Sequence, residues 1–96
     1  MELSAFRDSL AGTAPPPELP AAVAGLWWDA KGNWDRAHDC AQAQDDAAGA
    51  AVHAYLHRKE GDLSNARHWY NRAGRAPATG TLDAEWEALA KELLAA

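Results

Sequence analysis

The sequence predicts an all-α domain, and its composition and apolar spacing support this fold class. The 96 residues include 24 Ala and 10 Leu but only 2 Val and no Ile. Ala and Leu are strong helix formers, whereas strands favour β-branched and aromatic residues. Apolar residues also recur at helical spacing between Gly and Pro clusters, and the chain length suits a single core. We therefore expect two antiparallel helix pairs with a C-terminal helix that caps them.

The N-terminal part, residues 1–18, is expected to be a helical arm and a connector. Three apolar residues at helical spacing predict a short amphipathic helix over residues 2–11. Residues 14–17 read Ala-Pro-Pro-Pro, which cannot lie inside a helix because Pro lacks the backbone N–H. The arm should pack loosely against the single main domain, which covers residues 19–96.

Four helices are expected in the first part of the main domain. Two Gly residues are each followed by Asn or Asp, so that the Gly ends one helix and the next residue caps the following one. Gly49 and the two Asp residues before it indicate the end of the second helix or the turn after it. The expected helices cover about residues 20–31, 34–44, 50–60 and 63–73.

The last helix is expected to begin after Thr81 or Asp83, either of which can cap it. Its apolar residues recur at intervals of four, three and four residues: Leu82, Trp86, Leu89 and Leu93. The opposite face is mostly acidic, as expected of an outer helix that covers a core.

Charge and cysteine content exclude several classes of partner. The net charge is −5 with a pI near 5.2, so a general affinity for nucleic acid or anionic lipid is not expected. Cys40 is the single cysteine and cannot form an intramolecular disulfide, which suits a reducing compartment. No segment has the pattern of a signal peptide or a membrane span. We expect a soluble, cytoplasmic protein.

The sequence contains an internal repeat with an offset of 29 residues. This offset aligns residues 31–34 with residues 60–63, and Ala37 with Ala66. In both copies Gly ends a helix, Asn or Asp caps the next, and one large apolar residue is expected to pack against the turn. The small Ala falls where two helices can cross closely.

This spacing resembles a tetratricopeptide repeat. The first unit matches at the small, large, turn and crossing positions Gly25, Trp28, Gly32, Asn33, Trp34 and Ala37. The second unit matches at Gly61, Asp62, Leu63, Ala66, Tyr70 and Ala73. Residues 65–74 are still more similar to the second helix of a Sel1-like repeat, which favours an Ala, a Trp-Tyr pair and a following Ala. The offset of 29 is shorter than the 34 residues typical of tetratricopeptide repeats.

Residues 53–75 are also similar to small uncharacterised bacterial proteins of this kind, which indicates a fold but no activity. The repeat resemblance implies a non-catalytic protein–protein interaction module. In such repeats the first helices of successive units line a concave groove. A peptide or a partner subunit would bind there, and a second copy of the chain could extend so short a groove.

The repeat register places a set of candidate binding residues in this groove. Trp27 and Trp28 lie about 100° apart on a helix, and the register assigns Trp28 to the interior, so we expect Trp27 to reach the binding surface. Cationic residues of the third helix could hold a peptide carboxylate, although a charge run is usually a solvated face. The candidate groove residues are Trp27, Asp29, Tyr55, Arg58 and Lys59.

A metal or histidine-based enzyme is the alternative function. His53 and His57 are four residues apart on one helix, a spacing that metal-binding helices use. Further ligands would have to come from His38, Cys40, His68, Glu60 or Asp62, none of which forms a recognisable second pair. The simpler interpretation is a pair of interior histidines with hydrogen bonds. We therefore expect no catalytic residues, no cofactor and no bound metal.

Cys40 and His38 are the most obvious candidates for nucleophilic catalysis, but they are two residues apart on a helix and do not face each other. A Cys at a helix crossing is more simply a small apolar residue. The sequence therefore favours a binding function over catalysis.

Overall fold

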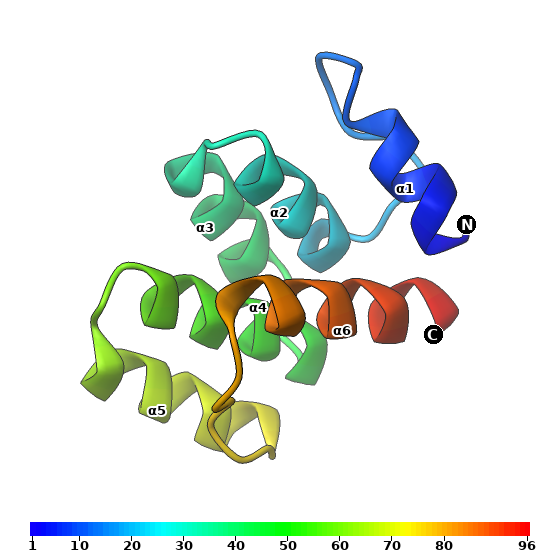
Figure 1. The fold of residues 1–96 in the computed structure, drawn as a ribbon. Helices are drawn as coiled ribbons and strands as arrows, with labels where there is room; N and C mark the ends of the chain where they lie inside the picture. The colour runs from blue at the N-terminus through cyan, green and yellow to red at the C-terminus, as the bar shows by residue number, and fades with distance from the viewer.

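The computed structural model describes all 96 residues and is entirely helical (Figure 1). Its six helices cover 68% of the chain, and no strand is present. The all-α prediction is therefore confirmed. The helices are α1 (Leu3–Ser9), α2 (Ala21–Ala30), α3 (Trp34–Ala43), α4 (Ala47–Lys59), α5 (Leu63–Ala73) and α6 (Leu82–Ala95).

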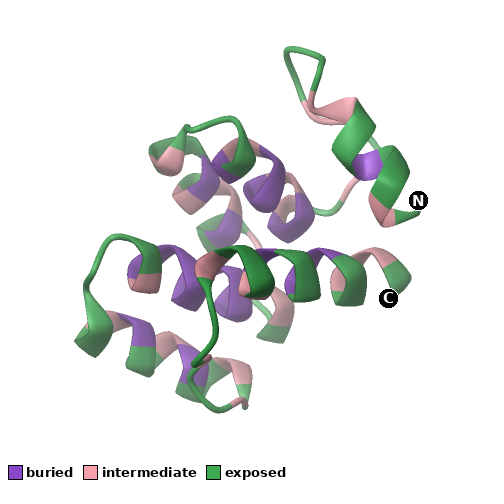
Figure 2. Ribbon diagram, viewed as in Figure 1, coloured by how far each residue is buried: buried purple, intermediate pink, exposed green.

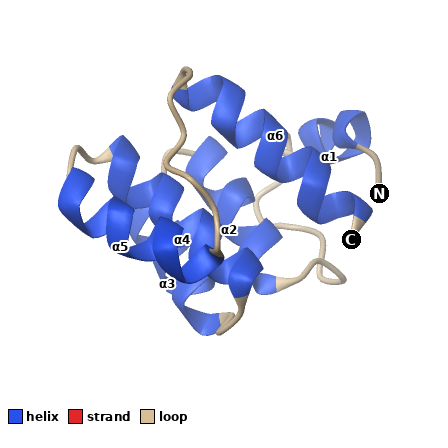
Figure 3. Ribbon diagram, turned by 90° about the horizontal axis from the view of Figure 1, so that it is seen from below, coloured by secondary structure: helices blue, strands red, loops and turns tan.

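Helices α2 and α3 pack together as one pair and α4 and α5 as a second, and α3 joins the pairs by packing on α4. Helix α4 is the centre of the molecule, with every residue from Gly49 to His57 buried (Figure 2). Helix α6 crosses α2 and α4, and α1 lies beside α6 (Figures 1 and 3). No helix has the length and apolar character needed to cross a membrane.

The two turns at the 29-residue offset have the same backbone geometry. Gly32 and Gly61 have φ angles of 81° and 89°, a region that L side chains rarely adopt. After each Gly the side chain of Asn33 or Asp62 accepts a hydrogen bond from the backbone N–H three residues later, at 3.1 and 3.2 Å. These local signals explain why the boundaries at residues 30–34 and 59–63 agree with the predicted ones.

The start of α4 differs from the prediction by three residues. Asp46 caps the helix by accepting a hydrogen bond from the Gly49 N–H at 2.9 Å, so the helix already begins at Ala47. Gly49 therefore lies inside α4 and not in the turn before it. A Cβ atom at this position would lie 1.8 Å from the carbonyl oxygen of Gln44, so Gly is required by close backbone packing.

The N-terminal arm packs more tightly than expected. Phe6 of α1 is completely buried and stacks on Trp86 of α6, with ring centroids 5.8 Å apart. Ser9 accepts a hydrogen bond from the indole N–H of Trp27, at 3.1 Å. The expectation of a loosely packed arm is wrong because Phe6 and Ser9 provide apolar and polar partners for tryptophans of the main domain.

Candidate functional site

The predicted groove is covered in the structure, and Trp27 is completely buried within it. The indole N–H of Trp27 donates a hydrogen bond to Ser9 of α1, and the Lys31 ammonium lies 5.6 Å from the centroid of the Trp27 ring. Trp28 is the more exposed of the two tryptophans, with the Arg36 guanidinium 4.5 Å from its ring centroid. The expectation that Trp27 reaches the surface is therefore wrong, because α1 covers the side of α2 that the register leaves open.

Asp29 and Tyr55 form a buried polar pair beneath α6. The Tyr55 hydroxyl donates to the Asp29 carboxylate at 2.7 Å, and the Lys59 ammonium lies 2.9 Å from the other carboxylate oxygen. Burial, together with the negative Asp29, raises the pKa of the Tyr55 hydroxyl. Asp29 and Tyr55 satisfy each other's polar atoms and stabilise the fold, whereas the Lys59 side chain pairs with Asp29 and remains 40% exposed.

Arg58 is the predicted groove residue that lines a groove at the surface. Its guanidinium donates to Glu85 of α6 at 2.9 Å and to the carbonyl of Gly80. The Tyr70 hydroxyl donates to the second oxygen of Glu85. Burial and this neighbouring carboxylate raise the pKa of Tyr70.

A small groove lies on the other side of Arg58, between α5 and the loop 74–81. We call it the arginine groove, and its volume is about 190 Å³. Leu63, at the first turn of α5, is 63% exposed there, so it does not pack against the turn as the repeat register suggests. Arg67 is exposed and takes part in no ion pair. The lining residues are Arg58, Leu63, Ala66, Arg67, Tyr70, Pro77 and Ala78.

Sequence reasoning missed this groove as a site, although one signal was present. Residues 63–82 contain three arginines and no Asp or Glu, in a chain with a net charge of −5. This stretch forms α5 and the loop after it, where Arg72 and Arg75 pair with Asp45 and Glu92 and Arg67 has no ion pair. A groove between a helix and an irregular loop has no local sequence pattern, because its walls come from different elements.

A second candidate site lies between α3, α4 and α5, where three of the four histidines meet. His38 of α3 packs against His53 and His57 of α4, with ring centroids 4.5 and 5.3 Å away. The centroids of His53 and His57 are 4.8 Å apart. One ring nitrogen of each histidine lies within 4.8 Å of the corresponding atoms of the other two. We call these residues the histidine cluster.

Two tryptophans enclose the histidine cluster. The Trp34 ring stacks on His38 with centroids 5.0 Å apart, and Trp69 stacks on His53 at 3.8 Å. Trp34 donates its indole N–H to the carbonyl of Leu56, at 2.9 Å, which fixes its ring. The imidazoles of His38 and His53 are thus stacked on aromatic faces.

The members of the cluster differ in their hydrogen bonds. Nδ1 of His57 lies 2.6 Å from a Glu60 carboxylate oxygen, and the Asn65 amide nitrogen lies 3.4 Å from its Nε2. His53 is only 4% exposed and has no hydrogen bond to another protein group. Burial, and the neighbouring His38 and His57, lower the pKa of His53 to about 4, so its ring is neutral near pH 7. The interpretation as interior, hydrogen-bonded histidines therefore describes His57 but not His53.

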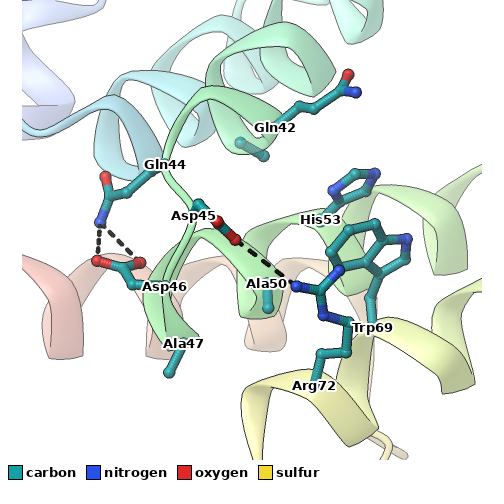
Figure 4. A pocket seen from close by; sticks show the side chains of 10 residues that line it. Gln42, Gln44, Asp45, Asp46, Ala47, Ala50, His53, Trp69 and Arg72 are labelled. Carbon is teal, nitrogen blue, oxygen red and sulfur yellow. Dashed lines mark hydrogen bonds and ion pairs between the residues drawn. The ribbon is translucent and has the colours of Figure 1, made fainter.

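His53 also lines a cavity of about 200 Å³ that opens beside the α3–α4 turn (Figure 4). The Trp69 ring and the Arg72 guanidinium form one wall, and Asp45 lies opposite, 3.6 Å from Arg72. Solvent and small solutes can therefore approach His53 from this side.

The structure gives no support to catalysis by Cys40. Its thiol is half-buried, and burial, together with the nearby Asp39, raises its pKa. A thiol with a raised pKa is a poor nucleophile near neutral pH.

Comparison with protein families, curated proteins and solved structures found no match to this chain.

Proposed function

We propose that the protein is a non-catalytic protein-interaction module, related to tetratricopeptide and Sel1-like repeats, that holds an acidic segment of a partner protein in the arginine groove. The supporting observation is the exposed Leu63 beside Arg58 and Arg67 in one groove, where Arg67 has no ion pair. The single Cys40 fits a reducing, cytoplasmic compartment.

Charge complementarity favours an acidic partner. Arg58 is already paired with Glu85, so Arg67 is the cation available to a ligand. A guanidinium can bind a carboxylate through two parallel hydrogen bonds, which fixes the orientation of the ligand as well as attracting it. The remaining surface of the protein is mostly acidic and would repel such a segment, so binding would be confined to this edge.

Leu63 would supply the apolar part of the interaction. Covering its exposed side chain would contribute about 1–2 kcal/mol to the free energy of binding, at the usual value for apolar surface removed from water. Pro77 and Ala78 give the opposite wall a rigid apolar surface. A groove of this size accepts only a few side chains, so we expect a weak and transient complex.

The place of binding differs from the one that the repeat register predicts. Helix α6 already covers α2 and α4, where a peptide would be expected to bind. A peptide that used the predicted face would have to displace Trp86, whose indole N–H donates to the Leu26 carbonyl at 2.9 Å. Binding in the arginine groove leaves α6 in place.

The proposal can be tested with a fluorescent acidic peptide that contains Glu residues and one Leu, in an anisotropy titration. The Arg67→Glu variant should bind at least about tenfold more weakly. Lys91→Glu is the matched control, because Lys91 is an exposed cation of α6 with no ion pair. Equal affinities of the two variants would refute the arginine groove.

A second copy of the chain is the other candidate partner. Light scattering at several protein concentrations distinguishes self-association from binding of a foreign protein.

A further inference from the structure

We propose that His38, His53 and His57 form a binding site for a divalent transition-metal ion. The site is separate from the arginine groove, and neither proposal depends on the other. Its ligands come from two helices that pack directly on each other, α3 and α4. Sequence spacing indicated only the His53–His57 pair, and the packing of α3 on α4 provides the third imidazole.

The distances suit coordination after small side-chain rotations. Nitrogen ligands lie 2.0–2.1 Å from zinc, so two ligands of a tetrahedral site are about 3.3 Å apart. The three nitrogen atoms here lie within 4.8 Å of one another. Closing each gap requires movements of about 1.5 Å or less, which rotation about the Cα–Cβ and Cβ–Cγ bonds can provide without a change of the backbone.

His57 has the environment of a metal ligand. Its Nδ1 is held by the Glu60 carboxylate at 2.6 Å, which leaves Nε2 as the atom with a free lone pair. A carboxylate behind a ligating imidazole is a common arrangement that fixes the tautomer and the ring orientation. The one contact to Nε2 is the Asn65 amide at 3.4 Å, a weak hydrogen bond that a metal ion could replace.

His53 provides the second, independent observation. The residue is 4% exposed and no protein group hydrogen-bonds its ring, but the ring lines the cavity beside the α3–α4 turn, so its unpaired nitrogen remains accessible to a solute. An accessible imidazole nitrogen that no protein group occupies is free to act as a metal ligand. Coordination of a metal ion would give this nitrogen a partner.

The donor set selects the class of metal. Imidazole nitrogens suit Zn²⁺, Ni²⁺, Co²⁺ and Cu²⁺, whereas Mg²⁺ and Ca²⁺ require oxygen ligands. Three protein ligands leave one position of a tetrahedral ion free. The cavity beside the α3–α4 turn reaches one of the three ligands, His53 (Figure 4). Trp34 and Trp69 would limit the access of water to the ion.

The test is equilibrium dialysis of chelator-treated protein against Zn²⁺, together with thermal unfolding with and without Zn²⁺. We expect one ion per chain and a higher Tm with Zn²⁺. His38→Gln should lower the affinity by about 100-fold, and Glu60→Gln by about tenfold. His68→Gln is the matched control, because His68 is the fourth histidine, is exposed and lies outside the cluster. It should bind as the wild-type protein does.

Two results would overturn the proposal: a wild-type protein that takes up no Zn²⁺, or a His38→Gln variant that binds as tightly as the wild type. Substitution of the buried His53 or His57 can disturb folding, so His38 is the primary variant, since it is only partly buried on α3. Circular dichroism of the metal-free variants verifies that each remains helical. Peptide binding by the same variants reports separately on the arginine groove.

Discussion

The Arg58 guanidinium of α4 lies 2.9 Å from the Glu85 carboxylate of α6, and both side chains are largely shielded from solvent. This ion pair joins the C-terminal helix to the face that the repeat register predicts to be open. Tyr70 of α5 donates to the same carboxylate, so one side chain of α6 connects two other helices. Helix α6 is thereby part of the fold and not a detachable cap.

Replacement of Glu85 by Gln should therefore destabilise the protein substantially. The amide keeps the shape of the side chain but leaves Arg58 as an unpaired, largely buried charge, which costs about 2–4 kcal/mol. Glu87→Gln is the control, because Glu87 is half exposed and lies 3.7 Å from Arg7. Its loss should change the free energy of unfolding by less than about 0.5 kcal/mol. Urea denaturation measures both values, and similar values for the two variants would contradict the role of Glu85.

The neighbouring tryptophans of α2 should respond differently to the same substitution. Trp27→Phe leaves a cavity in a completely buried position and removes the hydrogen bond to Ser9. We therefore expect it to lower the free energy of unfolding by about 2–3 kcal/mol. Trp28→Phe removes surface that is partly exposed, so it should lower the free energy of unfolding by about 1 kcal/mol or less. Chemical unfolding of the two variants compares them directly. A larger effect at Trp28 would restore the register in which Trp27 faces the surface.

These examples show which parts of the structure can be predicted from sequence. The boundaries around Gly32 and Gly61 follow from local backbone requirements and are correctly predicted. Which of Trp27 and Trp28 is buried depends on α1, whose position no local pattern in α2 reports. Local conformational preferences are therefore visible in the sequence, whereas the partner of each apolar face is not.

The two candidate sites show the same difference between what local sequence predicts and what only the packing of helices determines. His53 and His57 are predictable as a pair because they are one helical turn apart on α4. His38 lies on another helix, 15 residues before His53, and reaches the pair only through the packing of α3 on α4. Leu63 was expected to pack against its turn and is exposed instead, so the arginine groove emerges only from the loop that faces α5.

Gly49 offers a test of the start of α4, which the sequence misplaces by three residues. Ala is about 1 kcal/mol better than Gly inside a helix, so propensity alone predicts that Gly49→Ala stabilises α4. In the structure the new Cβ would lie 1.8 Å from the Gln44 carbonyl oxygen, and the α3–α4 turn would have to move. We expect a net destabilisation of about 2–3 kcal/mol. Gly80→Ala is the control, since the nearest atom to its added Cβ is 4.0 Å away, and thermal unfolding should distinguish the two.

The cap of α4 should give the protein a defined sensitivity to acid. The Gly49 N–H and, to a lesser extent, the Gln44 side chain donate hydrogen bonds to the Asp46 carboxylate and hold its pKa below the usual value of 3.8. A carboxyl group whose pKa is lower in the folded state stabilises the protein above the pKa of the unfolded chain. This stabilisation is lost as the pH falls through the lower, folded pKa.

The Asp46→Asn variant isolates this contribution, because Asn is an equally good helix cap but does not titrate. Between pH 5 and 7 the two proteins should differ by a constant amount in Tm. Below a pH of about 4 the wild-type Tm should fall more steeply than that of Asp46→Asn, since only the wild type loses a charged cap. Parallel Tm curves down to pH 2 would mean that the Asp46 carboxylate contributes no more as an anion than as a neutral acceptor.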